Sequence, residues 1–236
     1  MERRAFLLAL GALTACGRRR ETTLVAGSSL RSALPALIGD RPIAVSYGSS
    51  GQLERQIEAG APVDGAVFVS AGPVDALIAK GLADPTTRRV IAENRMVLVG
   101  PKGSPPLGFK GLAALPADAK IAIGDPAHVP AGKYAEQVLR KLGAWDAVRG
   151  RLVLGEDVAS VVAYARRGEV AAAVVYGSDV RGVADLVVLD EPPADAQPRV
   201  EVVGVAMKGA SAEAREFLAY LATPAAHAVL VEHGFR

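Results

Sequence analysis

Short apolar runs alternate with longer amphipathic segments along the chain from residue 22 onward. The apolar runs predict strands at residues 23–26, 43–47, 67–69, 95–99, 120–123, 152–154, 170–176, 186–189 and 200–206. The amphipathic segments predict helices at residues 30–38, 53–59, 73–80, 131–142, 158–167, 212–221 and 224–233, with another beginning near Ser178. Strands that alternate with helices are typical of βαβ units, in which helices cover both faces of a mainly parallel sheet.

This α/β pattern contains more strand–helix units than one small sheet needs. We therefore expect two doubly wound lobes with mainly parallel sheets, lobe 1 formed by residues 23–97 and 205–236 and lobe 2 by residues 98–204. The chain would cross between them near residues 97–101 and again near residues 199–204, and two crossings make a hinge. Ligands of open α/β sheets bind at the carboxyl ends of the strands. Both lobes should therefore present these ends to a common cleft.

The N-terminal residues differ from this pattern. Arg3 and Arg4 precede an apolar stretch at residues 5–13, which is too short to cross a bilayer because a spanning helix needs roughly 20 apolar residues. A charged start followed by a short apolar stretch is typical of a secretory signal. We expect residues 1–15 to be a signal peptide, and the sequence leaves open whether export follows the general or the twin-arginine route.

Cys16 is the only cysteine and lies three residues beyond the end of this stretch. The segment Leu13-Thr14-Ala15-Cys16-Gly17 resembles the lipobox of bacterial lipoproteins, in which the cysteine becomes the new N-terminus and carries diacylglycerol. The resemblance implies an exported protein whose lipid anchor on Cys16 holds it at the extracytoplasmic face of the cell membrane, with residues 16–22 as a lipidated tether. The alternative is an incidental or buried cysteine, because free cysteines often pack as small hydrophobic residues.

Composition narrows the function further. The net charge of +2 is close to balanced, so nothing indicates a nucleic-acid partner. The three scattered histidines, without cysteine or paired carboxylates nearby, do not suggest a metal-cation site. Cleavage before Cys16 would leave about 220 residues, half of them apolar, which can form the core of one or two domains without disulfides. We expect the protein to be a monomer.

Candidate chemistry lies in four strand-to-helix turns that share small or hydroxyl residues and lack positive charge. They are Gly27-Ser28-Ser29-Leu30, Gly48-Ser49-Ser50-Gly51, Val129-Pro130-Ala131-Gly132 and Glu156-Asp157-Val158-Ala159. A helix start exposes unpaired backbone N–H groups and the positive end of the helix dipole, so several starts in one cleft form an anion site without a cation. The alternative for each turn alone is simple helix capping, above all for Asp157.

The amino-acid sequences of these turns resemble those of the periplasmic molybdate-binding proteins of ABC importers. The similar segments run from about residue 23 to the C-terminus and include Ala26-Gly27-Ser28-Ser29-Leu30, Gly48-Ser49-Ser50-Gly51-Gln52-Leu53, residues 56–62, residues 124–135, Leu142-Gly143-Ala144-Trp145, Glu156-Asp157-Val158 and Val175-Tyr176-Gly177-Ser178-Asp179. The resemblance implies a type II periplasmic binding protein fold that captures molybdate or tungstate for a membrane permease. It implies neither a cofactor nor catalysis.

In the family that the chain resembles, hydroxyls and backbone amides hold the oxyanion, and no charged side chain touches it. Carried over, the hydroxyl donors are Ser29, Ser50 and Tyr176, and further amide donors are Ala131 and Val158. Ser28 and Ser49 replace their neighbours if the register of either serine pair is off by one. If the family resemblance is set aside, the sequence predicts equally well that Tyr176 is only a half-buried aromatic residue at a strand end.

One segment departs from the family pattern. The family reads Ala-Pro-x-Asp followed directly by an apolar residue, Phe and a Ser-Ala pair, whereas here Gly65 and Ala66 separate Asp64 from the apolar run. The difference is either a two-residue insertion or an aspartate displaced from the strand. It makes the geometry on the hinge side uncertain, although none of the implied ligand contacts lies there.

The sequence leaves three alternatives open: a different anion as ligand, an enzyme, and a sensing domain of a regulator. The ligand could be another anion such as sulfate or thiosulfate, although an organic acid usually needs an Arg clamp and none of the four turns contains Arg. A serine-dependent enzyme would want a Gly-x-Ser-x-Gly elbow and a partnered histidine, which the serine turns lack. A sensing domain of a regulator would need a DNA-binding or signalling extension, and an export signal stands in its place.

Overall fold

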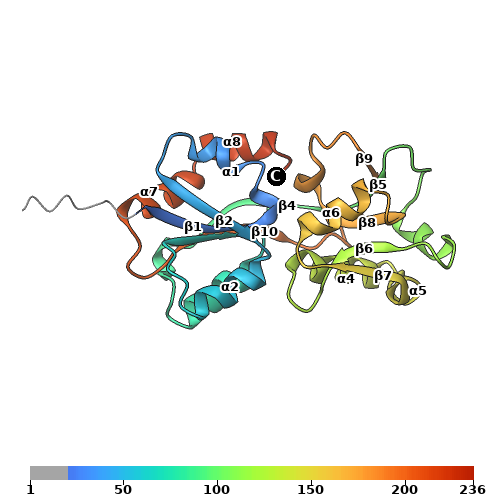
Figure 1. Ribbon diagram of the computed structural model, residues 1–236, viewed down its shortest axis with the longest axis horizontal. Helices are drawn as coiled ribbons and strands as arrows, with labels where there is room; N and C mark the ends of the chain where they lie inside the picture. Colours follow the sequence, from blue (N-terminus) through green and yellow to red (C-terminus); the bar gives the residue numbers. More distant parts are fainter. Residues whose placement is uncertain (1–20) are drawn as a thin grey trace, which may run out of the picture.

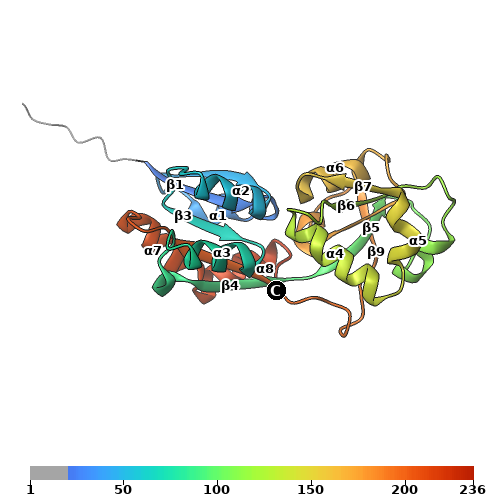
Figure 2. The ribbon, with the colours of Figure 1, turned by 90° about the horizontal axis from the view of Figure 1, so that it is seen from below.

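The structure, a computed structural model, describes residues 21–236. The expected signal peptide, Cys16 and most of the expected tether lie outside the described residues. Within residues 21–236, no helix combines the length and the apolar character needed to cross a membrane. Two α/β lobes lie side by side along the long axis of the molecule, and extended segments of chain join them (Figures 1 and 2).

A five-stranded sheet in the order β2-β1-β3-β10-β4 forms the centre of the first lobe. Its strands are β1 (Thr22–Gly27), β2 (Ile43–Gly48), β3 (Gly65–Phe68), β4 (Arg89–Asn94) and β10 (Val200–Ala206). Helices α2 (Ser50–Glu58) and α3 (Ala71–Ala79) cover one face, and α1 (Leu34–Ile38), α7 (Ala212–Leu221) and α8 (Pro224–Glu232) cover the other (Figure 1). Successive side chains of a strand point to opposite faces, so Leu24 and Val25 of β1 enter different cores.

The second lobe repeats this plan with a sheet in the order β7-β6-β8-β5-β9. Its strands are β5 (Met96–Pro101), β6 (Ile121–Gly124), β7 (Leu152–Gly155), β8 (Ala172–Tyr176) and β9 (Leu186–Asp190). Helices α4 (Pro130–Lys141) and α5 (Trp145–Val148) lie on one face, and α6 (Val158–Arg166) lies on the other (Figure 2). Short 3-10 helices occur at η1 (Ser28–Leu30), η2 (Pro85–Thr87), η3 (Phe109–Ala114), η4 (Arg149–Arg151) and η5 (Gly177–Val180).

The two-lobed α/β fold agrees with the sequence, but the sheets are mixed rather than mainly parallel. Strand β1 pairs in parallel with β2 and β3, and β6 does so with β7 and β8. Strand β10 is antiparallel to β3 and β4, and β5 is antiparallel to β8 and β9. Only parallel neighbours need a helical crossover within the same sheet. The chain enters β5 and β10 from the other lobe, so these strands need no such crossover and can run antiparallel to their neighbours.

The crossings lie a few residues earlier than the sequence indicated. Residues 96–97, expected in lobe 1, already pair in the second sheet as part of β5. Residues 200–204, expected in lobe 2, pair in the first sheet as part of β10. The first error arises because the sequence prediction omitted β4, in which a run of only three apolar residues, Val90-Ile91-Ala92, lies between charged residues. Only Arg95 separates β4 from β5.

Asp64 lies immediately before β3, and its side chain ties two elements together. One carboxyl oxygen accepts a hydrogen bond from the Thr23 amide at 2.9 Å, and the other accepts one from the Ser211 amide at 3.1 Å. Gly65 and Ala66, which make the spacing unusual, are regular members of β3 paired with β1. The departure from the family pattern is therefore accommodated at the amino end of β3, whereas the cleft lies at its carboxyl end.

Candidate functional site

One small cavity lies between the lobes and contains about 240 Å³ of empty space. Its walls come from the carboxyl ends of strands in both sheets and from the turns and helix starts that follow them. All the residues to which the sequence assigned ligand contacts line it, which are Ser29, Ser50, Ala131, Val158 and Tyr176, together with the alternatives Ser28 and Ser49. The fold therefore brings together, from both lobes, positions that lie far apart in the sequence, such as Ser29 and Tyr176.

The turn after β1 forms the first wall. We expected a helix from residue 30, but the chain makes a single 3-10 turn at Ser28–Leu30 and α1 begins only at Leu34. No side chain caps this turn, so its orphan N–H groups stay at the cavity wall. Gly27 permits close packing here, because a Cβ at this position would lie 3.3 Å from the Val69 side chain and 3.5 Å from the Ser50 Oγ.

The two serines at the start of α2 have different roles. Ser49 is the N-cap, and its Oγ accepts a hydrogen bond from the Gln52 amide at 3.2 Å. Ser50 is the first residue of the helix, is buried and lines the cavity, and the cap does not use its hydroxyl. Both serines line the cavity, but the capping alternative applies to Ser49, and the Ser50 hydroxyl is the one that the cap does not use.

Two helix starts form the wall on the side of the second lobe. Helix α4 has no side-chain cap at Val129 and begins with Pro130, which has no N–H group, so Ala131 carries the first amide donor of the helix. At α6, the Asp157 side chain accepts the Ser160 amide at 2.8 Å, as the capping alternative predicted. Val158 precedes the capped amide and lines the cavity. Both helices direct the positive ends of their dipoles to this space.

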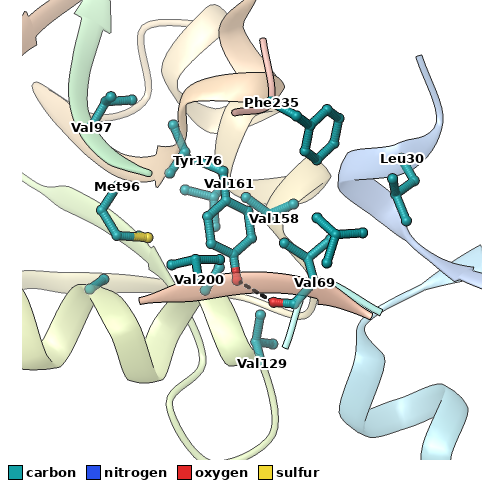
Figure 3. Close-up of a cluster of buried hydrophobic side chains, with 14 of the residues drawn as sticks. Leu30, Val69, Met96, Val97, Val129, Val158, Val161, Tyr176, Val200 and Phe235 are labelled. Carbon is teal, nitrogen blue, oxygen red and sulfur yellow. Dashed lines mark hydrogen bonds between the residues drawn. The ribbon is translucent and has the colours of Figure 1, made fainter. Parts of the chain in front are cut away.

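Tyr176 at the end of β8 crosses from one lobe to the other. Its hydroxyl donates a hydrogen bond to the Val69 carbonyl oxygen at 3.2 Å, as Figure 3 shows. Burial raises the pKa of the Tyr176 hydroxyl well above its usual value, with Tyr134 and Asp179 adding to the shift. The hydroxyl is therefore a neutral donor at physiological pH. Its single proton is engaged with Val69 here, so it would have to turn away from Val69 in order to donate to a ligand.

Backbone contact holds the lobes close beside the cavity. Gly51 in the first turn of α2 faces the His128 carbonyl in the loop before α4, and a Cβ on Gly51 would lie 2.4 Å from that oxygen. Real Cβ atoms do not approach so closely, so only glycine allows this arrangement of the two lobes.

The cavity is electrically unusual for an anion site. Among the residues that the structure describes, no Lys, Arg, His, Asp or Glu lines it, and no group of three or more His, Cys, Asp or Glu in that part of the chain could hold a metal ion. The walls offer hydroxyls and helix-start amides, which are donors. Such a cavity can bind a small anion through hydrogen bonds and dipoles, without an ion pair.

Sequence reasoning missed two participants near the cavity. Val69 lines it and supplies the carbonyl that Tyr176 contacts, and its place at the carboxyl end of a predicted strand could have indicated it. Asp179 hydrogen-bonds the Tyr176 amide at 3.2 Å. The sequence indicates Asp179 only as part of a segment that resembles the family, although an acidic residue three positions after a strand end is a common capping signal.

Comparison with known proteins agrees with this geometry. Residues 28–236 match the family described as bacterial extracellular solute-binding proteins. The chain is 36% identical over 230 residues to the molybdate-binding protein ModA of Haemophilus influenzae, covering 91% of this chain and 89% of that protein. It is 37% identical over 196 residues to a putative ABC transporter substrate-binding lipoprotein of Bacillus subtilis, covering 80% of this chain and 74% of that protein.

A solved structure confirms the architecture. The periplasmic molybdate-binding protein of Azotobacter vinelandii matches with a TM-score of 0.81 at 24% identity, over 92% of this chain and 99% of that chain. At this identity the likeness establishes the fold alone, which is the type II periplasmic binding protein fold. With a family match over almost the whole described chain, the protein belongs to the bacterial extracellular solute-binding proteins.

Proposed function

We propose that this protein captures molybdate or tungstate outside the cytoplasm and delivers the anion to the membrane permease of an ABC importer. The observation that carries the proposal is a small interlobe cavity lined by hydroxyls and helix starts, without a charged side chain. The 36% identity to a molybdate-binding protein supports the same ligand. The protein acts by binding alone and needs no cofactor.

Hydrogen bonds can supply the binding energy that such a site needs. A dianion gives up its hydration shell only if the cavity returns comparable bonds, and each hydrogen bond to a charged group contributes about 1.5–3 kcal/mol. About seven such bonds would support binding tighter than micromolar, which corresponds to about −8 kcal/mol. The proposed donors are the hydroxyls of Ser29, Ser50 and Tyr176 and the amides of Ser29, Ser50, Ala131 and Val158.

Donor chemistry also selects among anions. Hydrogen phosphate keeps a proton at neutral pH and needs an acceptor for it, and within residues 21–236 no carboxylate lines the cavity. Sulfate is fully ionised but smaller, so only cavity size excludes it. Backbone amides on packed helix starts form a stiff cage, because shrinking it would disturb two cores at once. Molybdate and tungstate have nearly equal size and should bind alike.

Calorimetric titration with a panel of oxyanions tests this selectivity. We expect molybdate and tungstate to bind, and sulfate and thiosulfate to bind at least about a hundredfold more weakly, a difference of about 2.7 kcal/mol. Phosphate serves as the control for protonated anions. Equal affinity for sulfate would exclude the molybdate assignment and leave a general oxyanion-binding protein.

The two serines of α2 provide a matched pair of variants. Ser50→Ala should weaken molybdate binding by about tenfold to a hundredfold, because it removes one hydrogen bond to a charged ligand, and should leave stability nearly unchanged. Ser49→Ala should lower the free energy of unfolding by about 1 kcal/mol, because it removes a helix cap. Urea unfolding and calorimetry on both variants measure the two effects. If Ser50→Ala lost stability but kept its affinity, Ser50 would be a structural residue.

The Gly51 contact gives a test of lobe closure. Gly51→Ala should reduce molybdate affinity by at least about tenfold, because the new Cβ collides with the His128 carbonyl when the lobes close. Helix α2 itself should tolerate the change, since alanine favours helix by about 1 kcal/mol over glycine. Gly72→Ala in α3 is the control, because its Cβ would meet only the Ser70 Oγ, at 3.9 Å. Unchanged affinity in Gly51→Ala would show that binding does not need this approach of the lobes.

Lipid anchoring at Cys16 is part of the proposal. The lipobox-like residues 13–17 support it, and so does the name of the Bacillus subtilis relative, a putative lipoprotein. In cells, the wild-type protein should partition into the detergent phase of a Triton X-114 extraction, and Cys16→Ser should move it to the aqueous phase. Identical partitioning of the two proteins would contradict the anchor.

The site supports an esterase-like function less well than it supports anion binding. A serine nucleophile needs a neighbouring base, and within residues 21–236 no histidine borders the cavity. The His128 ring instead lies near Asp125, at 3.6 Å between Nδ1 and the carboxylate. The arrangement therefore favours capture of the anion over turnover of an ester.

A further inference from the structure

A second tyrosine of the second lobe contacts the same segment of the first lobe as Tyr176. Residues 69 and 70 connect β3 to α3 in the first lobe. The Tyr176 hydroxyl donates to the Val69 carbonyl at 3.2 Å (Figure 3). The hydroxyl of Tyr134, in α4, donates to the Ser70 Oγ at 3.4 Å. Two neighbouring residues of one lobe are thus each held by a tyrosine of the other lobe.

The Ser70 hydroxyl is available for this contact because it does not cap its own helix. Ser70 is the N-cap residue of α3, but its side chain accepts no capping hydrogen bond. The third residue of α3 is Pro73, which has no N–H group to donate to a capping side chain. At α2 and α7, by contrast, Ser49 and Ser211 accept the amide of the third helical residue. The local sequence therefore leaves the Ser70 hydroxyl free to meet the other lobe.

The two tyrosines lie on different sides of the cavity wall. Their rings pack edge to face, with centroids 6.4 Å apart and an angle of 61° between the ring planes. Tyr176 lines the anion cavity, whereas Tyr134 and Ser70 line an adjoining groove between α2, α3 and α4. The Tyr134 hydroxyl can therefore influence a ligand in the cavity only through the position of the lobes and of the Tyr176 ring.

The two contacts respond differently to an anion. Tyr176 has one hydroxyl proton, and donating it to a ligand means giving up the Val69 carbonyl. One contact between the lobes is then lost at the moment when they must stay closed. Tyr134 faces no such choice, because it does not line the cavity. Its hydrogen bond to Ser70 can persist while the anion is bound.

We propose that Tyr134 is a positioning residue that, with Ser70, holds the lobes closed over the anion while the Tyr176 hydroxyl turns to the ligand. This inference rests on the proposed function, because it requires an anion that takes the Tyr176 proton. When the lobes separate, water replaces both partners, so the hydrogen bond stabilises only the closed form. Apparent affinity for a ligand of the closed form rises with the population of that form.

The variant Tyr134→Phe removes the hydroxyl and keeps the ring. By calorimetry we expect about a threefold to tenfold loss of molybdate affinity, the size of one net hydrogen bond. Tungstate should lose the same factor, because Tyr134 lies outside the cavity wall. Tyr164→Phe is the matched control and should bind as wild type, because the Tyr164 ring packs against Arg167 of its own lobe.

A double-mutant cycle with Ser70→Ala tests whether the two residues act as a pair. Ser70→Ala should cause the same loss of molybdate affinity as Tyr134→Phe, and the double variant should lose no more than either single variant. Urea unfolding of ligand-free Ser70→Ala should match that of wild type, because Ser70 does not cap α3. A pair with a purely structural role would instead lower the free energy of unfolding and leave affinity unchanged, which would overturn the inference.

The outcomes separate this inference from the proposed function. If wild type bound molybdate and Tyr134→Phe bound it equally well, the role of Tyr134 would be wrong and the proposed function would stand. Additive losses in the double variant would also overturn it, because the two hydroxyls would then act independently. If wild type bound neither molybdate nor tungstate, the proposed function itself would be wrong. Ser70→Ala removes the contact from the other lobe and decides the matter even if Tyr134→Phe folds poorly.

Discussion

The central constraint of this structure is that an anion cavity without cations must obtain its attraction from backbone amides and hydroxyls, each of which contributes only a part. No single turn offers enough donors, so turns from both lobes have to meet at hydrogen-bonding distance. The sheets arrange this, because the parallel strands of each sheet have their carboxyl ends at the same cavity. The interlobe geometry is therefore part of the binding site and not merely its support.

Small residues make that approach possible, and polar contacts across the cleft hold it. Gly51 lets α2 meet the His128 carbonyl of the other lobe, and within the first lobe Gly27 lets the end of β1 approach Ser50. The Tyr176 hydroxyl reaches the Val69 carbonyl of the opposite lobe (Figure 3). Closure and the choice of ligand donors are thus linked through a few groups at the same interface.

The sequence predicted the part of the site that depends on local rules. Small and hydroxyl residues at strand-to-helix turns indicated the four turns, the resemblance to the family selected Ser29 and Ser50 within them, and both residues line the cavity. What depends on contacts between distant segments was missed. The antiparallel direction of β5 and β10 follows from the two crossings, and the partner of Tyr176 lies 107 residues away. The sequence could not show that Ser49 is the helix cap and Ser50 is not, because this depends on which residue begins α2.

A crystal structure of the molybdate complex, with the metal located by its anomalous scattering, tests the central claim most directly. The account predicts molybdenum in the interlobe cavity, with ligand oxygens about 2.7–3.2 Å from the amides of Ser29, Ser50, Ala131 and Val158. It also predicts no charged side chain in contact with the anion. An anion held instead by arginine or lysine side chains, for example in the groove of Arg31, Arg166 and Arg181, would contradict it.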